Sequence, residues 1–177
     1  MAGAGYFVEG SQRENRHRAG GGRPLYLIAV FLLMLVFPLG SIGAEYAHFH
    51  GAVPLLPLMG KWFVFWSVGI RLFLAGLRQF FQPRFTAEQI FDIKSDDVLP
   101  LVRELGVANF ATGVVGIASL GMPGFVMPVA ISAGIFYGIA GIRHFAESNR
   151  TRNESIAMVS DLFVFLVLAV YIGSELA

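Results

Sequence analysis

Five long apolar runs dominate this sequence and determine what it can fold into. Each run is about 18 to 23 residues long, close to the roughly 20 residues that a helix needs to cross a hydrocarbon core of about 30 Å. The predicted spans cover residues 25–44, 62–81, 98–120, 125–142 and 156–173. The pattern predicts an all-α fold, a polytopic transmembrane helical bundle with five spans.

The composition agrees with a membrane protein. The chain is 55% hydrophobic and 14% charged, with a net charge of +1, whereas soluble domains average about 45 to 50% apolar and 25% charged residues. Such a small net charge offers no basic surface for nucleic acid. The absence of cysteine excludes disulfides, thiolate metal sites and cysteine nucleophiles. Membrane lipids are therefore the expected surroundings, and nucleic acid is not an expected partner.

The basic residues indicate the orientation of the spans. Lysines and arginines gather before the first span, between the second and third, and between the fourth and fifth. Because such residues in short loops resist translocation, the N-terminus is predicted in the cytoplasm and the C-terminus outside. Residues 1–24 are predicted to be a disordered cytoplasmic arm, and residues 25–177 a single transmembrane domain. A signal peptide cleaved after the first apolar run is the alternative.

A short amphipathic helix is predicted at the cytoplasmic surface over residues 86–95. Thr86 is followed three residues later by Gln89, the spacing of a capping box. The apolar residues that follow suit a helix that lies in the membrane interface. This helix is too short to form a sixth span.

Ionisable residues inside the spans carry the main functional signal, because each costs at least about 2.5 to 3.5 kcal/mol at mid-membrane. Their distance from the span ends places Arg71, Glu104 and Asp161 in the cytoplasmic half. We expect Glu104 to pair with Arg71 or Arg78, and we expect Asp161 to pair with Arg143. With the neighbouring Gln79, Arg143 and His144, these side chains form one predicted polar cluster, whose candidate ligand-binding residues are Arg71, Arg78, Gln79, Arg103, Glu104, Asn109 and Asp161.

Two interpretations of this polar cluster stay open. In the functional one, the cluster opens to the cytoplasm and holds an anionic headgroup or a proton. In the structural one, the arginines extend to the inner interface and the buried ion pairs fix the register of the helices. The apparent lack of charge in the outer half favours the structural interpretation, because a pathway across the membrane needs polar groups there too.

A second group of polar residues lies at the outer end of the first span. Glu45 and His48 have the Glu-x-x-His spacing that places a carboxylate and an imidazole on one helical face, as in di-metal bundles. Those sites need a second such pair, which is missing here. Glu45, His48 and His50 are therefore weak candidates for metal or haem ligation. No catalytic residues are predicted, because no Ser/His/Asp grouping or glycine-rich phosphate loop occurs, and the cofactor is left unknown.

Small residues four positions apart predict close helix packing on the third and fourth spans. We expect these two faces to pack against each other, with an interface between copies of the chain as the alternative. The residues are Ala108, Thr112 and Gly116 on the third span, and Ala130, Gly134 and Gly138 on the fourth.

The stretches RLFLAGLRQFFQPRFTAEQIFDI, from Arg71, and RELGVANF, from Arg103, resemble a family of small bacterial integral membrane proteins of unknown function. The resemblance covers about residues 61–145. A looser likeness is to DoxX-like membrane proteins, although this chain lacks the cysteine that a thiol-linked redox role would need. The resemblance implies a multi-pass protein of the bacterial inner membrane.

Three functions are compatible with these observations. The first is a non-enzymatic accessory or scaffold subunit of a membrane complex, favoured by the small size and the close-packing faces. The second is a binder or carrier of a lipid or another small amphiphile that uses the cytoplasmic-half cluster. The third is a metal or haem enzyme at the outer group. Partners are thus lipids and other membrane subunits or further copies of the chain.

Overall fold

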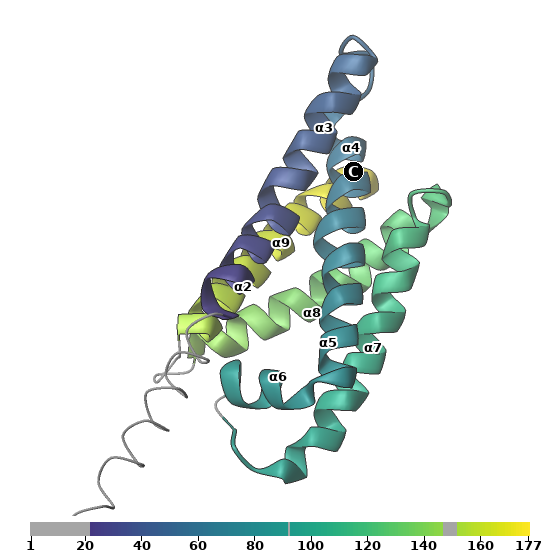
Figure 1. Cartoon of the computed structure of the whole chain (residues 1–177). Helices are drawn as coiled ribbons and strands as arrows, with labels where there is room; N and C mark the ends of the chain where they lie inside the picture. Colours follow the sequence, from purple (N-terminus) through teal and green to yellow (C-terminus); the bar gives the residue numbers. More distant parts are fainter. Residues whose placement is uncertain (1–21, 92, 147–151) are drawn as a thin grey trace, which may run out of the picture.

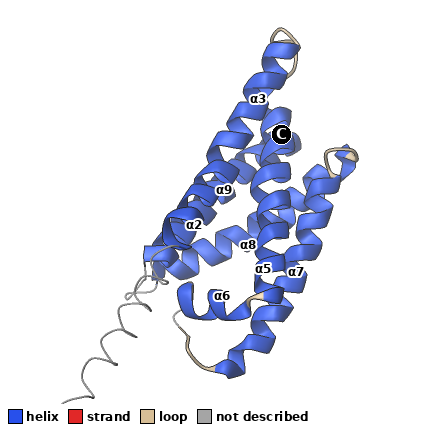
Figure 2. Cartoon of the chain, in the orientation of Figure 1, coloured by secondary structure: helices blue, strands red, loops and turns tan. Residues whose placement is uncertain are grey.

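The computed structural model describes residues 22–91, 93–146 and 152–177. Within these ranges the chain is built of helices without strands (Figure 2). Five of its stretches are long and apolar enough to cross a membrane, which confirms the five-span prediction, and they cover 27–48, 55–81, 96–118, 123–146 and 155–176. The predicted arm, 1–24, lies almost wholly outside the described residues. The side of the membrane that each terminus faces stays a prediction.

The first two spans each contain a π-helical segment. The first span consists of α2 (Gly22–Phe31), a π-helix (Leu32–Val36) and α3 (Phe37–His48). The second consists of α4 (Leu55–Phe63), a π-helix (Val64–Ile70) and α5 (Arg71–Phe81). The first helix continues to His48, four residues beyond the predicted end of the first span at residue 44. The second span begins seven residues earlier than predicted, because Pro54 and Pro57 occupy helix-start positions, where proline needs no helical N–H partner.

A short helix, α6 (Pro83–Gln89), lies across the end of the bundle where α5 ends (Figure 1). It begins at Pro83, three residues before the predicted start, and proline is favoured at the first helical position. Thr86 thus lies inside the helix and is buried, so the capping-box prediction is wrong. A 3-10 turn (Asp96–Val98) then leads into the third span, capped by the Ser95 hydroxyl, which accepts from the Asp97 N–H.

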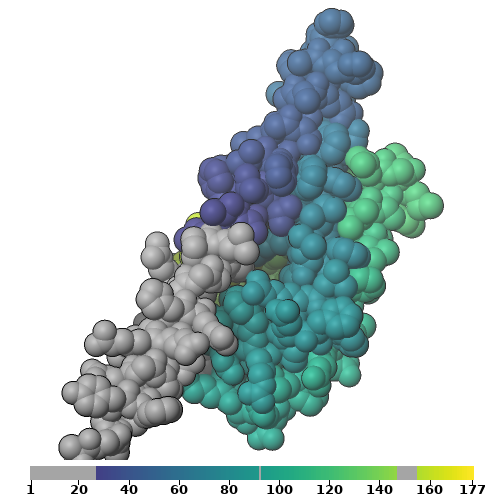
Figure 3. Space-filling view, viewed as in Figure 1, coloured from purple at the N-terminus to yellow at the C-terminus, as the bar shows by residue number. Residues whose placement is uncertain are grey.

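The remaining spans are α7 (Leu99–Ala118), α8 (Val126–Ala146) and α9 (Arg152–Leu176). A tight turn and a short 3-10 helix (Pro123–Phe125) join α7 to α8. The second span lies at the centre of the bundle and packs against the other four. In Figure 3 the first span, purple to blue, lies along the teal second span, and the green α7–α8 turn lies at the other side. The apolar core includes Phe63, Val64, Val68, Val164 and Leu168.

Glycines allow the second and third spans to approach backbone to backbone. A Cβ added to Gly76 would lie 2.6 Å from the Gly106 carbonyl oxygen, and one added to Gly113 would lie 2.7 Å from Phe73 Cα. Real side chains do not approach so closely, so the contact needs glycine on both helices. This pairing holds α7 against α5 with no intervening side chain.

The predicted packing of the third span on the fourth is wrong. The glycines of α8 face α9, where Gly138 lies against the ring of Phe165 and Gly134 lies near Leu168. On α7, Gly116 packs against Gly69 of the second span, while Ala108 is exposed. Small-residue spacing indicated close packing correctly, but it did not specify the partner helix.

Candidate functional site

The centre of the bundle holds a buried ion pair between the second and fifth spans. The Arg71 guanidinium donates from Nη2 to Asp161 Oδ1 at 2.8 Å. The two side chains are only 14% and 9% exposed. Arg71 also donates to the Ser160 hydroxyl at 3.3 Å, and that hydroxyl donates to the Ala157 carbonyl. Each charge is thereby neutralised where its transfer from water is costly.

Tyr137 joins α8 to the same site. Its ring centroid lies 5.0 Å from the Arg71 guanidinium carbon, within the range of a cation–π contact. Its hydroxyl donates to the carbonyl oxygen of Ser67 at 3.0 Å. The Ser67 hydroxyl in turn donates to the carbonyl oxygen of Leu33 at 3.2 Å. We call Arg71, Asp161, Ser160, Tyr137 and Ser67 the central network.

The two carbonyls that accept these side-chain bonds lie in the π-helical segments. Ser67 is within the π-helix of the second span and Leu33 is within that of the first. A π-helical turn departs from the regular i to i−4 ladder, and in a bilayer the carbonyls affected must find partners within the protein. The hydroxyls of Tyr137 and Ser67 provide such partners, so the central network links the first, second, fourth and fifth spans.

The depth of the central network follows from helix length. Arg71 is ten residues before the end of α5 at Phe81, about 15 Å along the helix axis. Leu55 is about 24 Å away in the other direction. The ion pair thus lies well inside the apolar span, where its two charged groups contact one another.

The ion pairing differs from the prediction. Asp161 pairs with Arg71 and not with Arg143. Glu104 is exposed and makes no ion pair with any residue that the structure describes, so its expected pairing with Arg71 or Arg78 is wrong. Arg78 stacks on the ring of Phe85 with its guanidinium carbon 3.4 Å from the centroid.

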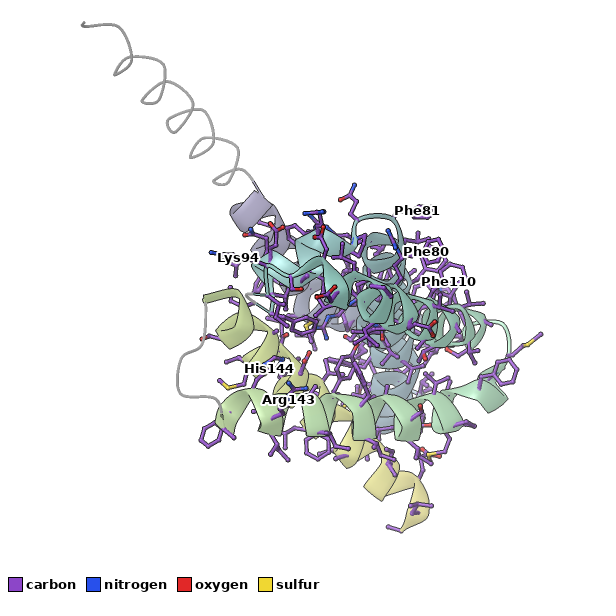
Figure 4. The ribbon with its side chains drawn as sticks, turned by 90° about the horizontal axis from the view of Figure 1, so that it is seen from below. Phe80, Phe81, Lys94, Phe110, Arg143 and His144 are labelled. Carbon is purple, nitrogen blue, oxygen red and sulfur yellow. The ribbon has the colours of Figure 1, made fainter. Side chains whose placement is uncertain are left out.

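Two members of the predicted cytoplasmic-half cluster contact each other, although no specific contact between them was predicted. Asn109 of α7 donates from its side-chain amide to Gln79 Oε1 of α5 at 2.8 Å. This neutral pair lies beside the glycines that bring the two helices together. Seen from below, Phe80, Phe81 and Phe110 gather at one edge, apart from Arg143 and His144 on α8 (Figure 4). Within the predicted cluster, Gln79 bonds to Asn109 while Arg71 bonds to Asp161, so these four residues form two separate pairs.

At the end of the bundle that is predicted to lie outside, Glu45 forms a second ion pair. Its carboxylate accepts from Lys61 Nζ at 2.7 and 2.8 Å and from Trp62 Nε1 at 2.7 Å. Three hydrogen bonds from two donor groups thus fix α3 to α4 near their connecting turn. His48 and His50 are exposed, and among the described residues no group of three His, Cys, Asp or Glu side chains is placed to hold a metal ion.

An open groove of about 520 Å³ lies at this same end of the molecule. It is formed by the α3–α4 turn, the start of α4 and the end of α9, and its walls include Tyr46, Leu55, Leu56 and Glu175. No residue of the central network lines the groove. None of the ligand-binding residues proposed from the sequence lines it.

A family model, DUF6790, matches residues 24–176, which is nearly the whole chain outside the N-terminal segment. DUF6790 is a family of unknown function. The chain belongs to the DUF6790 family. The match includes both partners of the buried ion pair, Arg71 and Asp161. No curated protein and no solved structure matches the chain. Membership agrees with the expected family of unknown function, whereas the likeness of the individual motifs and of DoxX-like proteins stays a prediction.

Three members of the central network of this DUF6790 chain were not predicted. Ser67 lies four residues before Arg71 and so shares its helical face, and Ser160 is adjacent to Asp161. Those spacings are visible in the sequence. Tyr137 carries no comparable signal, because its contact depends on α8 crossing the second span.

The hydroxyl of Tyr137 gives a test of the central network. Tyr137→Phe keeps the ring beside Arg71 and removes the donor to the Ser67 carbonyl. We expect a loss of about 1 kcal/mol in the free energy of unfolding, measured by denaturant titration in mixed micelles. Tyr46→Phe is the matched control, since Tyr46 is 39% exposed. Equal stability of the two variants would show that the Tyr137 hydroxyl contributes nothing.

Proposed function

We propose that this protein is a non-enzymatic scaffold or accessory subunit of a membrane assembly. The observation that carries the proposal is the central network, in which the charges inside the bilayer contact one another and join several spans. Arg71 is bonded to Asp161, and both side chains are largely buried. A ligand that took the place of Asp161 at Arg71 Nη2 would have to break this ion pair. The network supports a structural role for the residues first considered as a binding site.

The small share of the chain that lies outside the membrane spans supports the same function. The described connections between spans are short, and α6 packs against α5 and α7 at the end of the bundle. Most of the described surface therefore belongs to the sides of apolar helices. Contacts with other proteins would then form within the bilayer, through the outward sides of the spans.

The test is the mass of the intact protein in its own lipids. We expect the full chain, extracted with surrounding lipid and without detergent, to show by native mass spectrometry a stoichiometric partner beyond its own 19.3 kDa. The double variant Arg71→Met/Asp161→Leu should retain that partner, because an ion pair with a purely structural role can be replaced by apolar side chains.

Two outcomes would contradict the proposal. A protein that remains a single 19.3 kDa chain across a range of concentrations is not a subunit of an assembly. A single chain that carries a bound amphiphile, lost in the double variant, would instead support the lipid or amphiphile binder.

A further inference from the structure

We propose that the outward face of α7 binds a second copy of this chain in a parallel, two-fold symmetric contact. The outward face is defined as Glu104, Val107, Ala108, Ala111 and Val115, with Arg103 beside it, and all six are exposed. This inference rests on the proposed scaffold function and names the partner as the chain itself.

The outward face is the side of α7 that the bundle does not use. Gly106 and Gly113 face the second span. Ala111 is two residues from Gly113, so at about 100° per residue it points to nearly the opposite side of the helix. The turn to α8 leaves α7 with little contact to the fourth span. The inner face of α7 is thus occupied and its outward face is free in the single chain.

The side chains of this face differ from those on the lipid side of α8. There the exposed residues are large, with Ile135, Ile139 and Ile142 each about 60% exposed. The centre of the α7 face is formed by Ala108 and Ala111 instead. Small residues allow two helix backbones to approach closely in lipid, where large side chains would hold them apart. The α7 face therefore suits a helix partner better than the α8 face does.

The charges beside the alanines identify the partner. Gly106 packs against Phe80, so Glu104 is level with the end of α5, near the membrane surface. Neither Arg103 nor Glu104 makes an ion pair with a residue that the structure describes. Adjacent residues of opposite charge are self-complementary, because a two-fold axis brings Arg103 of one copy beside Glu104 of the other twice.

The symmetry follows from membrane insertion. Copies of one sequence insert with the same orientation, so their α7 helices run parallel and equivalent residues lie at equal depth. Arg103 and Glu104 differ in depth by only about 1.5 Å, which an arginine side chain spans easily. An axis along the membrane normal places Ala111 near its own copy.

The absence of cysteine makes a direct experiment possible, since a single introduced thiol can crosslink only to another copy. We expect Ala111→Cys in the full chain, in lipid vesicles, to form a disulfide-linked dimer on mild oxidation. Ala169→Cys, at an exposed alanine of α9, is the matched control and should stay monomeric. Equal crosslinking of the two variants would reflect random collision and would overturn the proposal.

Charge exchange tests the pairing itself. Glu104→Arg places like charges opposite each other and should weaken dimerisation roughly tenfold, measured by energy transfer between labelled copies. Arg103→Glu/Glu104→Arg should restore the dimer, because the two partners exchange roles. Lys94→Glu, an exposed charge outside this face, should have no effect. Failure of the double variant to recover would overturn the proposed pairing.

The combined results separate this inference from the proposed function. In one outcome, Ala111→Cys does not crosslink to itself, and Ala111→Leu releases a stoichiometric partner of another mass. That outcome would overturn the self-association and would still support the scaffold function. A mass of one chain with no crosslinking would overturn both. A mass of two chains with selective crosslinking at Ala111 would support both.

Discussion

Replacing Arg71 by methionine is expected to lower the free energy of unfolding by about 3 to 5 kcal/mol, the usual cost of removing one partner of a buried ion pair. Asp161 would keep its burial and lose the donor that lies 2.8 Å away. The double variant Arg71→Met/Asp161→Leu removes both charges and should recover most of that stability. Denaturant titration of the purified protein in mixed micelles measures each difference.

Arg84 provides the matched control for this prediction. It forms an ion pair with Asp96 at 2.6 Å, shorter than the buried pair, but both side chains are more than 60% exposed. Exposed pairs contribute only about 0 to 1 kcal/mol, so Arg84→Met should be nearly neutral. If the double variant were as unstable as Arg71→Met alone, the two charges would serve something other than each other, and the structural interpretation would be wrong.

Gly113→Ala is expected to separate α7 from the second span, at a cost of about 3 kcal/mol or more. The added methyl group would lie 2.7 Å from Phe73 Cα and 2.9 Å from the Gly69 carbonyl oxygen. Backbone atoms cannot rotate away as a side chain does, so the whole helix would have to move. Such a shift would also disturb the nearby hydrogen bond between Asn109 and Gln79.

Gly173→Ala is the control for the glycine contact. A Cβ at Gly173 has nothing within 4 Å, and alanine is the better helix former by about 1 kcal/mol, so this variant should be as stable as the parent or slightly more so. Limited proteolysis and denaturant titration of both variants would compare them. Equal stability of the two would contradict the backbone-to-backbone contact.

The sequence predicted the number and type of the helices well because both depend on hydrophobic length. Their boundaries were less accurate at the second span, which was predicted to begin at residue 62 and in fact begins at Leu55, with Pro54 and Pro57 at the start of the helix. The prediction that Thr86 caps the surface helix was wrong for a similar reason, because α6 begins three residues earlier, at Pro83. In both places a proline fits either a loop or a helix start, and only the surrounding fold distinguishes them.

The partners of the polar residues were harder to predict than their presence. Depth along a span indicated that Arg71 and Asp161 lie inside the membrane, but it did not indicate which helices are neighbours. Asp161 contacts Arg71 because the fifth span packs beside the second, a relation between segments 90 residues apart. Asn109 and Gln79 were placed in one cluster because both lie toward the same end of their spans, and they do meet, since the second and third spans pack against each other.

The separation of Arg71 from Asp161 also has a consequence for the order of biosynthesis. The second span leaves the ribosome before the fifth, and 90 residues take about 5 to 20 s to translate at 5 to 20 residues per second. During that interval the arginine has no aspartate beside it, and a bare charge in the bilayer interior is costly. Stable insertion of the second span therefore requires the fifth span. A nascent chain that stops before Asp161 would expose an uncompensated charge to membrane quality-control proteases.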